Sequence, residues 1–343
     1  MTTLNRELRV MNKPLHDSYL GTLFGLAYGD AFGAPFEFWN ADKIQEHFAN
    51  NELVLQPFIR GNQEFPAGFT TDDTAQMICL AESLLEKGFD LEDQFDRYCR
   101  WLNEGYGSAG GNAYGIGQHT VKVLLAGKEK ALSKLDGSDH KAGGNGALMR
   151  SAPLGLYYSG LGREMDNVWG RELIARTIES TYVTHNSEVN AWTCVAFNLL
   201  ISLILGTQKK EELLELVKFA LKEFDIGEVS AVLDFEYSDA NRDKLKISGY
   251  APDTLRIALW GFLTTDNYLD SIRKVMELGR DTDTFAAVAG ALAGAYYGYE
   301  HIRRQVKEEL VLHDRIDDIA NRLYENQGNI LPIFSNASDI SLS

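Results

Sequence analysis

Two short acidic segments at opposite ends of the chain contain the residue types best suited to binding metal ions. Residues 70–74 read Thr-Thr-Asp-Asp-Thr and residues 280–284 read Arg-Asp-Thr-Asp-Thr, and an apolar helical pattern follows each segment. Together they offer carboxylates flanked by threonine hydroxyls, and such oxygen donors suit hard divalent cations such as Mg²⁺ or Mn²⁺. The two pairs of carboxylates are sufficient to hold two metal ions.

Each segment taken alone also fits the N-terminus of a helix. A short oxygen side chain at that position accepts hydrogen bonds from unpaired backbone amides, and negative charge is favourable near the positive end of the helix dipole. Capping requires one oxygen, however, and does not account for paired acids with neighbouring hydroxyls in both segments. The two segments together favour a metal site, and helix capping is the alternative.

Glu37 and His185 are further candidates for chemistry. Glu37 follows a glycine-broken turn, residues 29–36, that carries Asp30, and it lies between two phenylalanines. Apolar surroundings raise the pKa of a carboxyl towards the range of a useful acid or base; an acid in a surface loop is the alternative. His185 lies between two predicted helices, where it is either a ligand-binding residue or a capping or buried histidine.

Long irregular stretches at residues 51–69, 103–117 and 136–146 separate the predicted helices. The second contains six glycines and the third contains four. Glycine lets backbone amides approach a ligand closely. Neither stretch resembles a P-loop or a dinucleotide-binding fingerprint, because no strand precedes it and no Gly-Lys-Ser/Thr follows. Ordinary flexible loops are the alternative interpretation.

Helical periodicity dominates the rest of the chain. Apolar residues recur at helical spacing in residues 77–85, 189–203 and 213–224, and alternation typical of strands is confined to a doubtful run at 229–237. The small-residue run 286–295 permits the close helix contact of a buried central helix. We therefore expect an all-α fold.

No repeat and no linker rich in Pro or Ser divides the chain, and the two acidic segments must meet if they share metals. We expect a single compact domain over residues 15–335, preceded by a polar extension over residues 1–14. The 343 residues are 45% apolar, which is ample for a core.

The formal charge of −16 argues against a nucleic-acid-binding protein, because phosphate contacts need clustered Lys and Arg. No stretch is convincing as a membrane span or signal peptide. Cys79, Cys99 and Cys194 have no paired spacing, so we interpret them as buried thiols in a reducing compartment. We expect a cytoplasmic protein.

The chain resembles the ADP-ribosylglycohydrolase family in six short motifs that occur in the family's order. They are Gly-Asp-x-x-Gly-x-x-x-Glu at 29–37, Thr-Asp-Asp-Thr at 71–74, Gly-Asn-Gly-Ala-Leu-Met-Arg at 144–150, Thr-His at 184–185, Ser-Gly-Tyr at 248–250 and Gly-Arg-Asp-Thr-Asp-Thr at 279–284. The glycine-rich loop at 108–120 looks more like the bacterial arginine-directed branch, which includes the dinitrogenase-reductase-activating glycohydrolases. That branch tends to show Phe-Asp-Ile-Gly where residues 114–117 read Tyr-Gly-Ile-Gly, so an acid near the aglycone is missing.

The resemblance implies an all-helical, multi-helix orthogonal domain with two divalent cations, Mg²⁺ or Mn²⁺. The implied metal ligands are Thr71, Asp72, Asp73, Asp281, Asp283 and Thr284. Glu37 and Asp73 are the implied catalytic carboxylates near the scissile bond. The implied substrate-binding residues are Gly110, Gly111, Gly144, Asn145, Gly146, His185 and Tyr250.

The activity implied is removal of ADP-ribose from a modified protein, by cleavage of the N-glycosidic bond of mono-ADP-ribosylarginine. ADP-ribosylserine or another linkage is an alternative. A second alternative is an immunity protein that binds and blocks an ADP-ribosyltransferase toxin, with the polar residues 1–13 as an arm, and such a protein could also hydrolyse. A third is a metal-dependent phosphohydrolase, which would use the same ligands.

Overall fold

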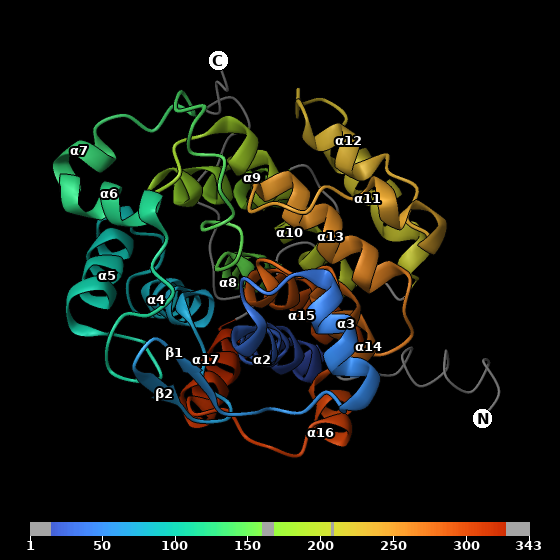
Figure 1. The fold of residues 1–343 in the computed structure, drawn as a ribbon. Coiled ribbons are helices and arrows are strands. Elements are labelled where there is room, and N and C mark those ends of the chain that lie inside the picture. The colour runs from blue at the N-terminus through green and yellow to red at the C-terminus, as the bar shows by residue number, and fades with distance from the viewer. Residues whose placement is uncertain (1–14, 160–167, 207–208, 327–343) are drawn as a thin grey trace.

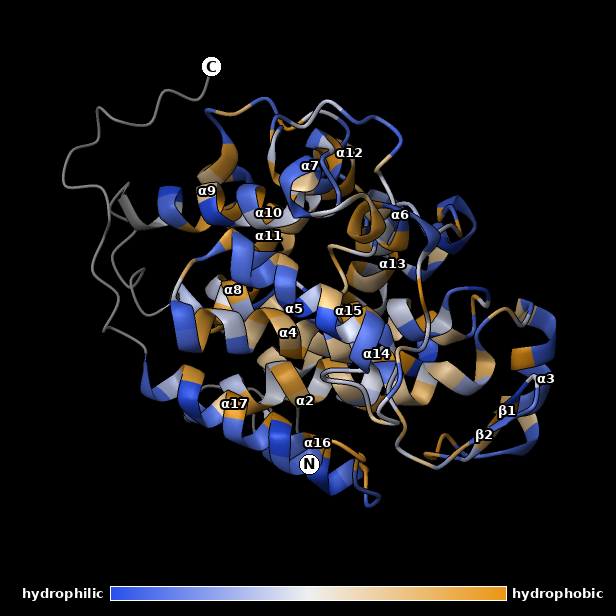
Figure 2. Cartoon of the chain, turned by 90° about the vertical axis from the view of Figure 1, so that its left-hand side faces the viewer, coloured by the Kyte–Doolittle hydropathy of each residue, from blue (hydrophilic) through white to orange (hydrophobic). Residues whose placement is uncertain are grey.

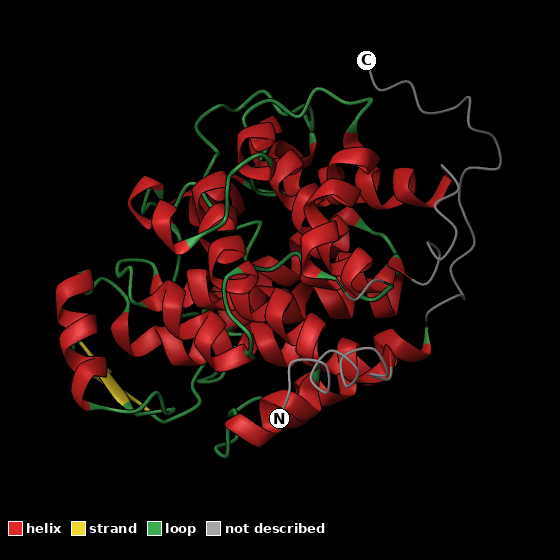
Figure 3. Cartoon of the chain, turned by 90° about the vertical axis from the view of Figure 1, so that its right-hand side faces the viewer, coloured by secondary structure: helices red, strands yellow, loops and turns green. Residues whose placement is uncertain are grey.

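Helices form almost all of the regular structure, so the all-α prediction is confirmed (Figure 3). The computed structural model describes residues 15–159, 168–206 and 209–326. The helices in these residues are α2 (Leu15–Gly33), η1 (Ala34–Phe36), α3 (Ala41–Asn50), α4 (Asp72–Lys87), α5 (Leu91–Glu104), α6 (Gln118–Ala126), α7 (Lys128–Leu132), α8 (Ala152–Tyr157), α9 (Val168–Tyr182), α10 (Glu188–Ile204), α11 (Lys210–Leu221), α12 (Val229–Leu233), η3 (Asp239–Lys244), α13 (Ala251–Leu263), α14 (Tyr268–Met276), α15 (Thr282–Tyr297), α16 (Tyr299–Gln305) and α17 (His313–Glu325). The predicted extension over residues 1–14 lies outside the described residues, and the proposed domain bounds stay a prediction.

A short antiparallel hairpin interrupts the helices between α3 and α4. Strands β1 (Phe58–Arg60) and β2 (Gln63–Phe65) pair Phe58 with Phe65 inside a stretch that we expected to be irregular. Three residues per strand are too few to show a period-two pattern in the sequence. Residues 229–237, whose alternation suggested a strand, begin with helix α12 (Val229–Leu233) instead.

Helices α2 and α15 lie against each other at the centre of the molecule, and both are buried along most of their length (Figure 1). The glycines of α2 that face α15 recur every fourth residue: Gly21, Gly25, Gly29 and Gly33. A Cβ atom on Gly25 would lie 2.2 Å from the carbonyl oxygen of Gly290. Only glycine permits this approach. The predicted close contact of the run 286–295 is therefore confirmed, with a glycine-spaced partner helix.

Most of the remaining helices surround this pair and share one large hydrophobic core, whereas α5 and α6 contribute to a smaller second cluster with part of α4. Figure 2 shows hydrophobic residues concentrated on α2 and α4 and hydrophilic residues along the outer side of α17. Within the described ranges, no helix combines the length and apolar character needed to cross a membrane. Cys79 and Cys194 are buried as expected, whereas Cys99 is only partly buried, and all three thiols are free.

Candidate functional site

The two acidic segments begin helices, but neither caps its own helix with a side chain. Helix α4 begins at Asp72, and its N-cap residue Thr71 makes no capping hydrogen bond through its side chain. Helix α15 begins at Thr282, and its N-cap residue Asp281 makes none either. The capping alternative therefore does not account for these two N-cap residues.

Asp30 provides the cap of α4 from another helix. It lies in the last turn of α2, not in a turn between elements as the sequence suggested, and it is fully buried. Its carboxylate accepts hydrogen bonds from the backbone amides of Thr71 and Thr74 at 3.0 and 3.1 Å and from their hydroxyls at 2.9 and 2.6 Å. Burial raises the pKa of Asp30 to about 6, and these hydrogen bonds oppose the increase. Sequence analysis singled out Asp30 without assigning this role.

The carboxylates of the two segments are buried close enough to repel one another. Burial raises the pKa of Asp72 and of Asp283 well above the usual range, and each is raised further by the negative charge of Glu37. The charge of Asp283 adds to the increase for Asp72, and that of Asp73 adds to the increase for Asp283. The fold thus brings together acids from α4, α15 and the segment after η1. Such a concentration of buried like charge is unfavourable without compensation by positive charge.

The donor chemistry of this group fits a divalent cation, although its side chains do not form a closed ligand set. One oxygen of Asp73, Oδ1, is buried without a hydrogen-bond partner, as is the hydroxyl of Thr70 nearby in the chain. Buried carboxylate oxygens normally have partners, and a cation would supply one. In the part of the chain that the structure describes, no three His, Cys, Asp or Glu side chains are arranged to hold a metal ion. The predicted pair of metal ions is therefore not confirmed.

Glu37 lies beside this group on a strained segment. Phe38 and Arg280 both have positive φ angles, 69° and 68°, which non-glycine residues rarely adopt. Their backbones are hydrogen-bonded: the Phe38 amide donates to the Arg280 carbonyl, and the Arg280 amide donates to Trp39 at 2.6 and 2.7 Å. Burial raises the pKa of Glu37, as expected, and an ion pair with Arg60 opposes the increase.

The glycine-rich loop before α6 contacts the acidic group through a residue that we did not predict. Gly115 has a φ angle of 79°, and a Cβ atom on it would lie 2.2 Å from Oδ1 of Asp72. The predicted ligand residues Gly110 and Gly111 are exposed elsewhere in this loop, and the nearest side chain to Gly110 is Phe69. Their assignment stays a prediction, whereas glycine at 115 is required by close packing.

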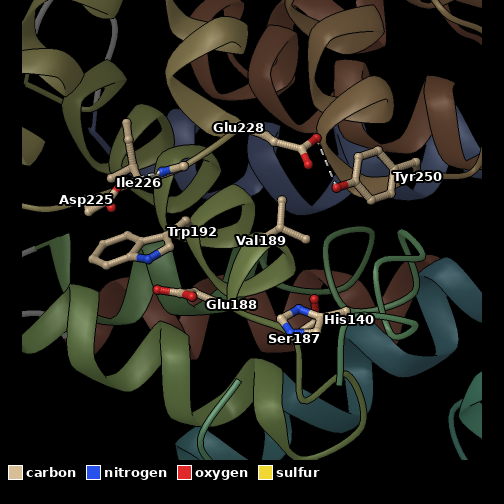
Figure 4. Close-up of a pocket in the computed structure, with 10 residues that line it drawn as sticks. His140, Ser187, Glu188, Val189, Trp192, Asp225, Ile226, Glu228 and Tyr250 are labelled. Atoms are coloured by element: carbon tan, nitrogen blue, oxygen red, sulfur yellow. Dashed lines mark hydrogen bonds between the residues drawn. The ribbon is translucent and has the colours of Figure 1, made fainter. Parts of the chain in front are cut away.

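The second glycine-rich loop joins the acidic group to a cavity. Asn145 donates its side-chain amide to Asp281 at 2.7 Å, and Gly144 pairs with Tyr250 as an isolated bridge. Tyr250 lines a cavity of about 270 Å³ with Trp192, and its hydroxyl contacts Glu228 at 3.2 Å (Figure 4). Burial raises the pKa of Tyr250 to about 12, with Glu228 as a lesser cause.

His185 lies beside the same loop. A Cβ atom on Gly146 would be 3.1 Å from His185 Nε2, and His185 Nδ1 lies 2.9 Å from the hydroxyl of Thr184. The side chain is buried, so its pKa is lowered well below the usual value, and the positive charge of Arg150 lowers it further. His185 is therefore a neutral, buried histidine next to the loop.

A chain of hydrogen bonds connects Asp72 to His185. Gln76 lies one turn after Asp72 in α4 and donates to its carboxylate at 3.4 Å, while Arg150 donates to Gln76 Oε1 at 2.6 Å. Arg150 also donates to the hydroxyl of Thr184 at 2.6 Å, next to His185. We did not predict Gln76, although its four-residue spacing from Asp72 could have indicated a contact on one helix face.

Comparisons with known proteins agree with the family resemblance. The profile of the family described as ADP-ribosylglycohydrolase matches residues 11–330. The chain is 30% identical over 310 residues to the ADP-ribosylarginine hydrolase Tri1 of Pseudomonas putida (strain GB-1), covering 90% of this chain and 78% of that protein. It is 27% identical over 290 residues to a Rhodospirillum rubrum protein named as a glycohydrolase of ADP-ribosyl-dinitrogen reductase, covering 84% of this chain and 88% of that protein.

A solved structure gives the same result. It is described as an ADP-ribosylglycohydrolase-related protein complex and aligns with a TM-score of 0.70 at 32% identity, covering 91% of this chain and 98% of that chain. The likeness extends over nearly the whole length of both chains. The chain belongs to the ADP-ribosylglycohydrolase family.

Proposed function

We propose that this protein removes ADP-ribose from the arginine side chains of modified proteins. The observation that carries the proposal is the buried group of carboxylates from α4, α15 and Glu37. Burial of these like charges opposes folding, and helix capping does not explain them, because the N-cap residues Thr71 and Asp281 make no side-chain capping hydrogen bond. Active sites are a common place for such costly arrangements. The name of the Pseudomonas relative supports arginine as the linkage, and the name of the Rhodospirillum relative supports a protein as the substrate.

The residues that would hold two divalent cations, Mg²⁺ or Mn²⁺, are Thr71, Asp72, Asp73, Asp281, Asp283 and Thr284. The buried Asp73 oxygen without a partner supports this assignment. When bound, such cations supply Lewis-acid charge, which offsets the carboxylates and polarises the ribose hydroxyls and water.

The chain's own groups would carry out the remaining tasks. Positive charge develops at C1 of the ribose when the N-glycosidic bond breaks, and the carboxylates of Glu37 and Asp73 would stabilise it. One of the two would accept a proton from the attacking water. The loop containing Gly144, Asn145 and Gly146 would bind the pyrophosphate beside the neutral His185, through the backbone amides of Gly144 and Gly146, because the amide of Asn145 donates to Gly249.

The cavity beside Tyr250 would take the rest of the ADP-ribose. It is lined by Val189 and Trp192 of α10 and by Tyr250, which pairs with Gly144, whereas Asn145 of the same loop contacts Asp281. A ligand that lies across this loop would therefore reach the acidic group with one end and the cavity with the other.

An assay with purified protein tests the proposal. ADP-ribosylated arginine and serine peptides are incubated with and without Mg²⁺ or Mn²⁺, and the products are identified by mass spectrometry. Free ADP-ribose and unmodified arginine peptide are expected only when a divalent cation is present. Release from the serine peptide alone would establish the alternative linkage, and AMP as the product would establish phosphate-bond cleavage.

A further inference from the structure

Arg60 occupies a position next to the candidate catalytic carboxylate. It is the last residue of β1. Its guanidinium donates from Nη1 to the carboxylate of Glu37, and from Nη2 to the carbonyl oxygen of Ala34, which lies 2.8 Å away. Two adjacent nitrogen atoms are thus bound by two separate acceptors, a geometry that suits the planar guanidinium and not a lysine ammonium.

Three aromatic rings surround the same guanidinium. Its central carbon lies 5.3 Å from the ring centre of Phe38, 5.8 Å from Phe58 and 5.9 Å from Tyr114. Aromatic faces within about 6 Å attract a cation. We call this set the guanidinium cage: Glu37, the carbonyl of Ala34, Phe38, Phe58 and Tyr114.

The element that delivers Arg60 is small and lies at the surface. The hairpin has three-residue strands joined by a turn at Gly61, where a side chain would meet nothing within 4 Å. Phe65 of β2 packs on Phe58, Phe69 and Tyr114, so the strands are held against the rest of the protein. Arg60, in contrast, is the last residue of β1, beside the turn, and its side chain is 29% exposed. Arg60 can therefore leave the cage by rotation of its side chain, with Phe58 in place and the domain folded.

The cage is placed where a leaving group would lie in the proposed reaction. One wall is Glu37, and another is Tyr114, whose neighbour Gly115 lies so close to Asp72 that a Cβ atom on it would be 2.2 Å from Oδ1. The cage differs from the cavity beside Tyr250, with which it shares no lining residue. A guanidinium bound there would be in contact with Glu37 and near the acidic group.

We infer that the cage is a binding site for the guanidinium of an arginine side chain and that Arg60 fills it from within the chain. This rests on the proposed function, because the occupant in turnover is the modified arginine or the arginine that hydrolysis releases. Arg60 is then a specificity-determining residue: a guanidinium ligand competes with it for Glu37 and the three rings. A serine leaving group has no positive charge and does not compete.

Calorimetric titration with ethylguanidinium tests the cage without any hydrolysis. The variant R60M removes the internal guanidinium but keeps an unbranched apolar stem, and R60K keeps a cation that cannot form the two-armed contact. We expect R60M to bind ethylguanidinium at least tenfold more tightly than the wild type, R60K to show a smaller gain, and R60M/E37Q to lose the gain. Ethylammonium, the matched probe, should gain less than ethylguanidinium.

Three results would overturn the inference. They are no gain in either R60M or R60K, a gain that survives in R60M/E37Q, and an equal gain for ethylammonium. Thermal melting verifies that each variant is folded, and R60K covers the case in which R60M is not.

Hydrolysis is measured in parallel so that the two proposals fail separately. R60M should lower KM for an ADP-ribosylarginine peptide by a larger factor than KM for an ADP-ribosylserine peptide. Hydrolysis of arginine peptides without a binding gain overturns the cage alone, and a binding gain without hydrolysis overturns the proposed function alone.

Discussion

Gly25 and Gly290 face each other so closely that a Cβ atom on either would lie 2.2 Å from the carbonyl oxygen of the other. We expect G25A to destabilise the protein by at least about 1–3 kcal/mol, because the two backbones must separate to admit the methyl group. Chemical denaturation measures this change. G170A in α9 is the matched control, since a Cβ atom at Gly170 meets nothing within 4 Å and alanine favours helices, so it should be neutral or stabilising. Equal effects of the two substitutions would contradict the close packing of α2 and α15.

Asp30 holds the first turn of α4 through its bonds to Thr71 and Thr74. In D30N, the NH₂ group of the asparagine faces N–H and O–H groups from which the carboxylate accepted hydrogen bonds. We therefore expect a loss of roughly 1–3 kcal/mol in the free energy of unfolding. Urea denaturation at neutral pH is the measurement. D42N is the control, because Asp42 is exposed on α3. A D30N protein as stable as D42N would show that the cap contributes nothing.

Asp283 contributes negative charge to a buried group that also includes Asp73 and Glu37. We expect D283N to lower kcat/KM for ADP-ribosylarginine by about 10²–10³-fold, a typical loss for one electrostatic group. Because the substitution relieves repulsion, the chelator-treated variant should be at least as stable as the chelator-treated wild type. Chelation of the wild type should abolish hydrolysis, and added Mg²⁺ or Mn²⁺ should restore it. Full activity of D283N in excess EDTA would refute the metal assignment.

His185 should make the protein less stable in mild acid. Its folded-state pKa is lowered by burial, by Arg150 and by His119, so the unfolded chain binds a proton near pH 6.5 that the folded chain does not. Stability is therefore retained above the unfolded pKa and decreases as the pH falls below it. The difference in unfolding free energy between wild type and H185Q, measured from pH 8 to pH 5, should shift in favour of H185Q. A difference independent of pH would mean that His185 binds its proton equally in the folded and unfolded states.

Gln76 links the buried Arg150 to Asp72. Q76L removes the acceptor at 2.6 Å from a guanidinium that is 2% exposed, and we expect a loss of about 2–4 kcal/mol from that buried, unpaired donor. Q76E restores an acceptor for Arg150 but adds negative charge beside Asp72, so it should recover stability better than Q76L. If Q76E were no more stable than Q76L, the contact with Arg150 would not be important.

Much of the helical architecture could be predicted because apolar periodicity reports burial directly. The periods at 77–85, 189–203 and 213–224 correspond to α4, α10 and α11. The glycine spacing of α2 is also visible in the sequence, but a glycine at every fourth residue indicates a close helix contact only when the partner helix is known. Strands of three residues carry no period, so the hairpin could not be predicted.

The acidic group could be proposed from residue types, whereas its detailed contacts could not. Asp72, Asp73 and Asp283 follow from chemistry and resemblance. Asp30 as the cap of α4 and Arg60 as the partner of Glu37 depend on how separate elements approach each other, which local sequence does not encode. The prediction that Asp30 lies in a turn was wrong because Gly29 and Gly33 resemble helix breakers in the sequence, whereas in the structure they are contact points with α15.

The backbone pairing of Phe38 with Arg280 makes Glu37 and Asp281 mechanically interdependent. Each carboxylate is one residue from a strained, hydrogen-bonded position, so a displacement of Glu37 large enough to admit a bulky substrate must break this ladder or carry Asp281 with it. The two carboxylates should therefore move together, and relaxation measurements on residues 37–40 and 279–281 should give the same exchange rate for both segments.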